Sequence, residues 1–130
     1  MTIRVLQPAG WPRPKGYANG MVAEGRQVFV AGQVGWNEQQ QFPATLSHQV
    51  RQALQNIVTV LNEANARPEH IVRLTWYVTS RDEYHAELQQ IGEAYREILG
   101  RHFPTMAVVQ VVALMEADAK VEIEATAVVP

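Results

Sequence analysis

The stretch MAVVQVVAL at residues 106–114 is the most informative part of the chain, because it is almost wholly apolar. As a strand it would alternate its side chains between two faces, and both faces would carry valines. One face has Val109, Val111 and Ala113, and the other has Val108, Val112 and Leu114. A strand that is apolar on both faces needs to be buried on both. The stretch therefore predicts a sheet with a cover on each side.

Further strands are predicted on both sides of this stretch. Residues 120–129 alternate strictly, with Val121, Ile123, Ala125, Ala127 and Val129 on one side and Lys120, Glu122, Glu124 and Thr126 on the other. Residues 71–79, 21–24 and 27–33 also have strand character, and Gly25-Arg26 is typical of a tight hairpin turn between the last two. The first twenty residues are rich in glycine and proline, which predicts an ordered loop or a short edge strand.

Two helices are predicted between the strands. Residues 46–64 repeat apolar side chains every three or four positions, with Thr45 as N-cap and Asn65 at the end. The second helix follows Ser80, which matches a capping box with Glu83, and it ends at Gly100. Its apolar face comprises Tyr84, Leu88, Ile91, Tyr95, Ile98 and Leu99.

The order strand, strand, helix, strand, helix, strand, strand is typical of an α+β domain, and residues 1–130 suit a single one. We expect a mixed sheet that is covered on one face by the two helices. Because those helices leave the second face of residues 106–114 uncovered, we expect another subunit to cover it.

Composition excludes several classes of function. The chain has no cysteine, so disulfides, thiolate catalysis and zinc-thiolate sites are excluded. Its formal net charge is −2 and its cations are scattered, which argues against nucleic acid as a partner. We see no signal peptide and no apolar run near the about 20 residues that cross a bilayer. We therefore expect a cytoplasmic protein without a membrane partner.

Common catalytic patterns are also missing. The only serines, Ser47 and Ser80, both lie at predicted helix starts, and no G-x-S-x-G motif is present. The four histidines, His48, His70, His85 and His102, have no spacing typical of metal ligands. We expect neither a metal nor a cofactor.

Several short strings occur in an order and spacing that resemble one known family. They are Gly16-Tyr17 with Gly20, Ala31-Gly32-Gln33, Gln49 with Ala53-Leu54-Gln55-Asn56-Ile57, Pro104, and Val121-Glu122-Ile123-Glu124-Ala125. Together they extend from about Gly16 to Val128 and resemble the RidA (YjgF) family of reactive intermediate deaminases. The resemblance implies a chorismate-mutase-like fold and a homotrimer with ligand clefts between subunits. It also implies hydrolysis of imines and enamines to carbonyl compounds and ammonia, without a cofactor.

Three residues match positions of the family's site. The resemblance makes Glu122 the catalytic residue, which orients and partly deprotonates a water molecule; without it, Glu122 and Glu124 would be solvated strand residues. Tyr17 is either a packed loop aromatic or a wall of the cleft. Gly32 either allows a bend at the strand end or lets the backbone approach a ligand closely.

Two positions depart from the family. Met106 stands where typical relatives have an arginine that holds the substrate carboxylate, and Gly92 stands where they have an asparagine. Together with Trp36, Met106 predicts a more apolar substrate-binding cleft. We therefore expect poor handling of small acids such as 2-iminopropionate and a preference for less charged or more apolar imines. Arg13 or Arg73 are candidates for a replacement cation.

Two other functions remain open at this point. The chain could be a non-catalytic, small-molecule-binding trimer on the same scaffold. It could also be a ribonuclease or translation inhibitor, as some relatives have been described, although it has no basic groove.

Overall fold

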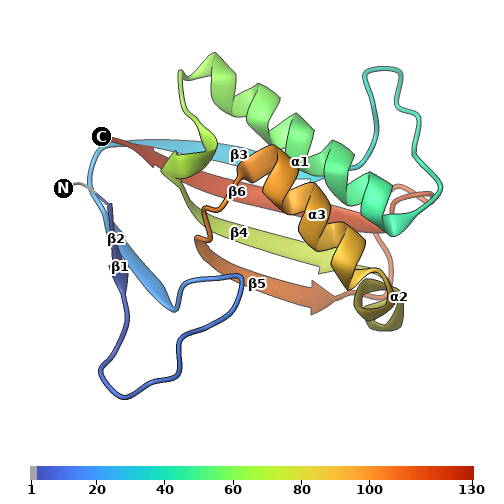
Figure 1. Cartoon of the computed structure of the whole chain (residues 1–130). Coiled ribbons are helices and arrows are strands. Elements are labelled where there is room, and N and C mark those ends of the chain that lie inside the picture. Colours follow the sequence, from blue (N-terminus) through green and yellow to red (C-terminus); the bar gives the residue numbers. More distant parts are fainter. Residues whose placement is uncertain (1–2) are drawn as a thin grey trace.

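The computed structural model describes residues 3–130 and contains a four-stranded mixed sheet with helices on one face (Figure 1). The strand order is β3 (Arg26–Val34), β6 (Val121–Val129), β4 (Ile71–Val78) and β5 (Thr105–Gln110). Strand β6 pairs antiparallel with β3 and β4, while β5 pairs parallel with β4. The predicted α+β architecture is confirmed, and β3 and β5 form the edges of this sheet.

The N-terminal strands form a separate two-stranded sheet. Strand β1 (Ile3–Leu6) pairs antiparallel with β2 (Gly20–Ala23), whereas β3 pairs with β6. The predicted hairpin between residues 21–24 and 27–33 is therefore wrong. Gly25 has φ +145°, and a Cβ at this position would lie 2.1 Å from the Val129 carbonyl oxygen. The chain passes close to the end of β6 at Gly25 and turns from one sheet into the other.

Helix α1 (Leu46–Glu63) follows the sequence prediction closely. The Thr45 hydroxyl accepts a hydrogen bond from the His48 backbone N–H, which confirms the predicted N-cap. The side chains buried along its length are Leu46, Gln49, Val50, Ala53, Leu54, Ile57 and Leu61. Asn65, which follows the helix, has φ 55°, a left-handed conformation that ends helices.

The predicted second helix is divided in two. Helix α2 (Arg81–Ala86) begins at Ser80, whose hydroxyl accepts from the Glu83 N–H, and α3 (Leu88–Leu99) follows after a break at Glu87. The Glu83 carboxylate binds Lys120. At the break, the Glu87 carboxylate accepts from the Ser47 backbone N–H at 3.0 Å, so the end of α2 is tied to the start of α1. A short 3-10 helix, η1 (Pro68–His70), leads into β4.

Strand β5 is shorter than predicted. Its pairing with β4 ends at Gln110, which lies opposite Val78, the last residue of β4. The chain then leaves the sheet, and Val112 is fully exposed in the following loop. Val112 and Leu114 are therefore not on a face of the strand, because an edge strand ends where its one partner ends.

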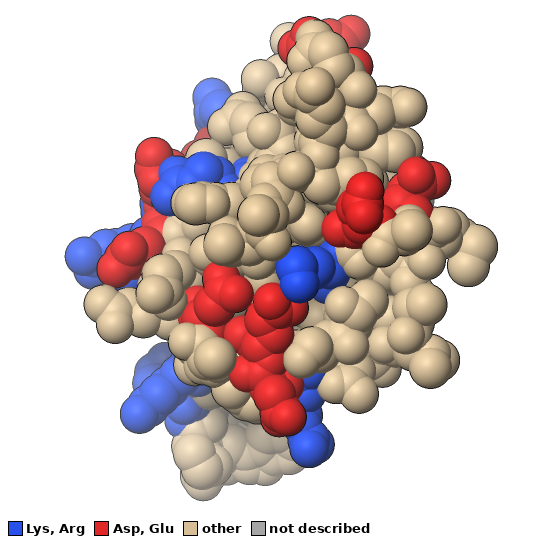
Figure 2. All heavy atoms as spheres, turned by 90° about the vertical axis from the view of Figure 1, so that its right-hand side faces the viewer, with Lys and Arg blue, Asp and Glu red and all other residues tan. Residues whose placement is uncertain are grey.

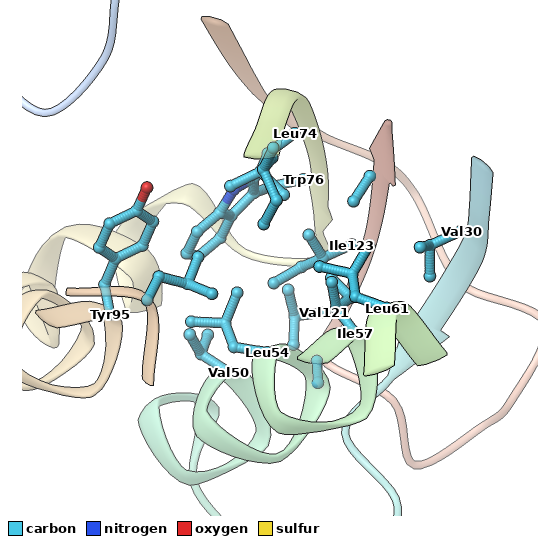
Figure 3. Close-up of a cluster of buried hydrophobic side chains, with 14 of the residues drawn as sticks. Val30, Val50, Leu54, Ile57, Leu61, Leu74, Trp76, Tyr95, Val121 and Ile123 are labelled. Carbon is cyan, nitrogen blue, oxygen red and sulfur yellow. The ribbon is translucent and has the colours of Figure 1, made fainter. Parts of the chain in front are cut away.

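The hydrophobic core lies between the sheet and helices α1 and α3 (Figures 1 and 3). Its largest fully buried side chains include Leu54, Ile57, Leu61, Leu74 and Ile123, each of which contributes about 1.5–3 kcal/mol by burial. Trp76 and Tyr95 lie at one end of this cluster (Figure 3).

No element among residues 3–130 covers the opposite face of the sheet. It carries Tyr77, Glu122 and Glu124, and Phe29 on β3 is 70% exposed. No helix among residues 3–130 has the length and apolarity required to cross a bilayer. Acidic and basic side chains are interspersed on the face that Figure 2 shows.

Candidate functional site

A pocket of about 640 Å³ lies between α3, β5 and the N-terminal loop. Tyr17 from the loop, Met106 from β5 and Gly92 from α3 all line it, so the structure brings these three predicted positions together. The other lining residues are Lys15, Gly16, Trp76, Tyr84, Leu88, Ile91, Tyr95, Arg96, Phe103 and Val108. Most of its wall is aromatic or aliphatic, as in typical small-molecule sites.

Tyr17 is held in this pocket by pairing of the N-terminal loop with the start of β5. The Ala18 N–H donates to the Pro104 carbonyl at 3.0 Å, and Ala18 forms a parallel bridge with Thr105. Ala18 is buried, whereas Tyr17 remains 44% exposed. The backbone contact at Ala18 therefore fixes Tyr17 as part of the pocket wall.

Stacked aromatic rings form one side of the pocket. The ring centroids of Trp76 and Tyr95 are 6.5 Å apart, and those of Tyr95 and Phe103 are 5.4 Å apart. Burial raises the pKa of both Tyr84 and Tyr95 above the usual value near 10, so both phenols are neutral at physiological pH. Within residues 3–130, the buried Nε1–H of Trp76 has no hydrogen-bond partner.

Met106 lies on the helix-covered side of the sheet. Its Cα partner on β4 is the buried Leu74, and its side chain packs against the core. Sequence analysis did not identify Arg96, which lines the same pocket one helical turn after Gly92. Residues four positions apart lie on the same side of a helix. The spacing between Gly92 and Arg96 could therefore have indicated that Arg96 faces the same site as Gly92.

Glu122 and Gly32 form a second group on the uncovered face. Val30 pairs with Ala125, and Gln33 pairs with Ile123. Between these two pairs β3 advances by three residues and β6 by only two, so β3 has one extra residue and forms a β-bulge. A Cβ on Gly32 would lie 2.2 Å from Glu122 Oε2, so a larger residue would displace the carboxylate. The half-buried Glu122 carboxylate has no hydrogen-bond or ion-pair partner in the described chain.

Glu124, two residues further on, has a different environment. It accepts a hydrogen bond from the Tyr77 hydroxyl at 2.8 Å. This hydrogen bond is the main cause that raises the pKa of Tyr77. Glu124 is therefore engaged within the sheet, while Glu122 is available to a ligand or to water.

The two groups lie on opposite faces of the same sheet. Met106 is in register with Leu74, on the side of the helices, while Glu122 is in register with Tyr77, on the uncovered side. Alternation along β4 separates these two sides. A single chain therefore does not place Glu122 and Met106 in one cleft.

The remaining candidates lie elsewhere. Trp36 packs against Phe42 with a centroid distance of 5.6 Å, and its carbonyl accepts from the Asn56 side chain. Arg73 lies beside Phe29 and Glu124 in a shallow hollow of the uncovered face, and Arg13 is exposed in the N-terminal loop. None of these three lines the pocket at Met106. The described residues contain no cluster of three or more metal-binding side chains.

Comparison with known proteins agrees with this architecture. The family model described as Endoribonuclease L-PSP matches residues 12–129. A Rid-family protein of unknown function from Yersinia pestis, YyfB, has 31% identity and a TM-score of 0.85, over 99% of this chain and all of that one. E. coli TdcF with bound serine has 30% identity and a TM-score of 0.70, over 98% and 99%. A goat (Capra hircus) 2-iminobutanoate/2-iminopropanoate deaminase is 28% identical over 96% of this chain and 89% of its own.

Proposed function

Because the chain belongs to the RidA/YjgF family, whose model is described as Endoribonuclease L-PSP, we propose that it hydrolyses imines or enamines and releases ammonia. It does so in the cytoplasm and without a cofactor. Deaminases of 2-imino acids are among the relatives of this chain, and TdcF binds an amino acid. The test is the release of ammonia and carbonyl product from an imine that an amino-acid oxidase generates in the assay.

The observation that carries this proposal is the contact between Gly32 and Glu122. The missing side chain of Gly32 leaves room for a carboxylate that makes no hydrogen bond in the described chain. A carboxylate with free acceptor oxygens is suited to orient a water molecule and to accept its proton. Glu124 lacks this freedom because it binds Tyr77.

The chemistry requires one water molecule for each imine. The water oxygen attacks the C=N carbon while Glu122 accepts a proton from the water and passes it to the imine nitrogen, which gives a neutral carbinolamine. Glu122 then accepts the proton of the carbinolamine hydroxyl and passes it to the nitrogen. The C–N bond breaks, ammonia leaves, the carbonyl forms, and Glu122 is again a carboxylate. The imine carbon is already electrophilic, so a positioned base is sufficient.

A complete cleft requires a second copy of the chain in this proposal. One subunit contributes the pocket of Tyr17 and Met106, and its neighbour contributes Gly32 and Glu122. The uncovered sheet face supports such an assembly, because Phe29 and Val109 are exposed there. Exposed apolar side chains at both edges of a sheet face that no described element covers are typical of a surface that another subunit covers. We propose a homotrimer, in line with the family resemblance.

Val109→Asp is expected to convert this trimer to a monomer. Val109 is 43% exposed and in register with Tyr77 on the uncovered face, so a charge there is tolerated by the free chain but not by a buried interface. Light scattering after size-exclusion chromatography measures the mass. Val60→Asp is the matched control, because Val60 is exposed on α1. A wild-type monomer at micromolar concentration, or a trimeric Val109→Asp variant, would contradict the assembly.

Met106 sets the substrate preference in this proposal. Methionine offers a soft apolar surface and no hydrogen-bond donor, so β5 provides no anchor for a substrate carboxylate. The chain therefore handles 2-iminopropionate-like acids poorly and prefers more apolar imines. Apolar and aromatic groups around Met106 support this preference.

Met106→Arg is expected to raise kcat/KM for 2-iminopropionate by about tenfold to a hundredfold. The guanidinium would donate charge-assisted hydrogen bonds, worth about 1.5–3 kcal/mol, to the carboxylate. The rate is measured with the imine formed from alanine by an amino-acid oxidase. Met115→Arg, in an exposed loop, is the control for added charge. Equal wild-type rates on alanine-derived and leucine-derived imines would contradict the preference.

A further inference from the structure

The pocket at Met106 carries positive charge without a compensating carboxylate. Its lining contains Lys15 and Arg96 but neither aspartate nor glutamate. A concave surface with charges of one sign concentrates ligands of the opposite sign. The pocket therefore favours an anionic group, although β5 supplies no cation.

Arg96 is positioned over Gly92 on the same side of α3. A Cβ on Gly92 would lie 3.3 Å from Arg96 Nη1 and 3.9 Å from Nη2. The guanidinium thus occupies space that any other residue at position 92 would narrow. The absence of a side chain at Gly92 allows Arg96 to lie along the helix at the pocket wall.

The donors of Arg96 are not used within the described chain. Its guanidinium makes no ion pair or hydrogen bond among residues 3–130. Of the carboxylates nearest on α3, Glu97 binds Arg51, and Glu93 accepts a hydrogen bond from Gln89. A planar guanidinium with free donors is suited to bind a carboxylate through two parallel hydrogen bonds.

Trp76 lines the same pocket and is almost fully buried. The side chain is 2% exposed, and its Nε1–H has no hydrogen-bond partner in the part of the chain described. Because this nitrogen is itself buried, Trp76 contributes an aromatic wall and no donor at the pocket surface. The free donors of the pocket are those of its charged side chains, Lys15 and Arg96.

The rest of the pocket is apolar. Aromatic and aliphatic side chains from Tyr84, Ile91, Tyr95, Phe103 and Met106 form its walls. Its volume of about 640 Å³ falls within the range of small-molecule sites. A ligand that suits both the Arg96 guanidinium and the apolar walls has a carboxylate at one end and a bulky apolar group at the other.

We propose that Arg96 supplies the carboxylate-binding cation of this pocket, from α3 rather than β5, and that the substrate is a 2-imino acid with a large apolar or aromatic side chain. The carboxylate binds Arg96, and the apolar side chain packs against Met106 and the aromatic rings. The imine part of this inference rests on the proposed hydrolase function, whereas the anion site does not.

Binding of two ring-bearing probes to the 130-residue chain tests the anion site. Phenylpyruvate carries a carboxylate and a carbonyl in place of the imine, and phenylacetone has the ring and the carbonyl without the carboxylate. By isothermal titration calorimetry, we expect the wild type to bind phenylpyruvate at least about tenfold more tightly than phenylacetone. Arg96→Gln is expected to abolish this preference and to retain phenylacetone binding. Arg101→Gln, an exposed arginine outside the pocket, is expected to behave like the wild type.

Gly92→Ala separates loss of the anion site from loss of the fold. Alanine stabilises a helix relative to glycine, so this variant is expected to unfold at the same or a higher temperature than the wild type. Its Cβ narrows the space of the Arg96 guanidinium, so phenylpyruvate binding is expected to weaken severalfold. A Gly92→Ala variant with wild-type affinity would count against the position assigned to Arg96.

The two proposals fail in different assays. An Arg96→Gln variant that binds phenylpyruvate as tightly as the wild type, or a wild type that binds neither probe, overturns the anion site. If binding depends on Arg96 but the wild type hydrolyses no phenylalanine-derived imine, the anion site stands and the hydrolase proposal fails. If hydrolysis occurs and Arg96→Gln leaves KM for that imine unchanged, the hydrolase stands and the role of Arg96 is refuted.

Discussion

Glu122→Gln is expected to lower the turnover of imine hydrolysis by about a hundredfold to ten-thousandfold, the range that a positioned general base contributes. Glutamine has nearly the same shape, so it keeps the contact with Gly32 on the uncovered sheet face. It cannot accept the proton of the attacking water as a carboxylate does. Initial rates of ammonia release from leucine-derived and phenylalanine-derived imines give the measurement.

Glu124→Gln is the matched control for this substitution. It lies two residues away on the same strand face, but its carboxylate accepts a hydrogen bond from the Tyr77 hydroxyl. Because this carboxylate is already engaged, we expect Glu124→Gln to retain turnover within about threefold of wild type, far less than the general-base effect. Unchanged turnover in Glu122→Gln would remove Glu122 from the mechanism. It would favour a non-catalytic trimer that binds small molecules on the same scaffold.

Gln49→Leu is expected to reduce the free energy of unfolding by about 3–5 kcal/mol. Gln49 is 1% exposed, and its Nε2 donates to the Pro43 and Asp118 carbonyl oxygens at 2.9 and 3.0 Å. Its Oε1 accepts from the Lys120 N–H at 2.8 Å. Leucine would leave three backbone groups without partners, and each unsatisfied buried group costs about 1–3 kcal/mol.

Urea unfolding, followed by circular dichroism, measures this loss. Gln55→Leu on the same helix is the control, because Gln55 is exposed and its change is expected to stay within about 0.5 kcal/mol. A Gln49→Leu variant as stable as Gln55→Leu would show that the three hydrogen bonds contribute little. Gln49 joins the loop before α1 to the loop before β6, so its loss acts on both segments.

Local sequence patterns determined those parts of the fold in which the spacing of apolar residues repeats over many positions. The apolar stripe of α1 and its Thr45 cap depend on spacing within one helix, and the structure confirms both. The alternation of β6 likewise places Glu122 and Glu124 on one face and their apolar neighbours on the other. The resemblance carried by short strings also identified the family correctly.

Boundaries and pairings, in contrast, depended on contacts between distant segments. Gly25-Arg26 is typical of a hairpin turn, but β2 pairs with β1 and β3 pairs with β6. Strand β5 ends at Gln110 because β4 ends opposite it, although the apolar run continues beyond. The helix after Ser80 breaks at Glu87, whose carboxylate binds the start of α1. Periodicity carries no information about such partners.

The sequence by itself proposed Tyr17, Gly32, Met106 and Glu122 as site residues, and only the tertiary structure decided which of them share a surface. Tyr17 and Met106 meet in one pocket because the N-terminal loop pairs with the start of β5. Glu122 lies on the other side of the sheet, because alternate residues of a strand point to opposite faces. Arg96 lines the same pocket as Met106 because the folded core places α3 across from β5. Their separation in the chain does not reveal this proximity.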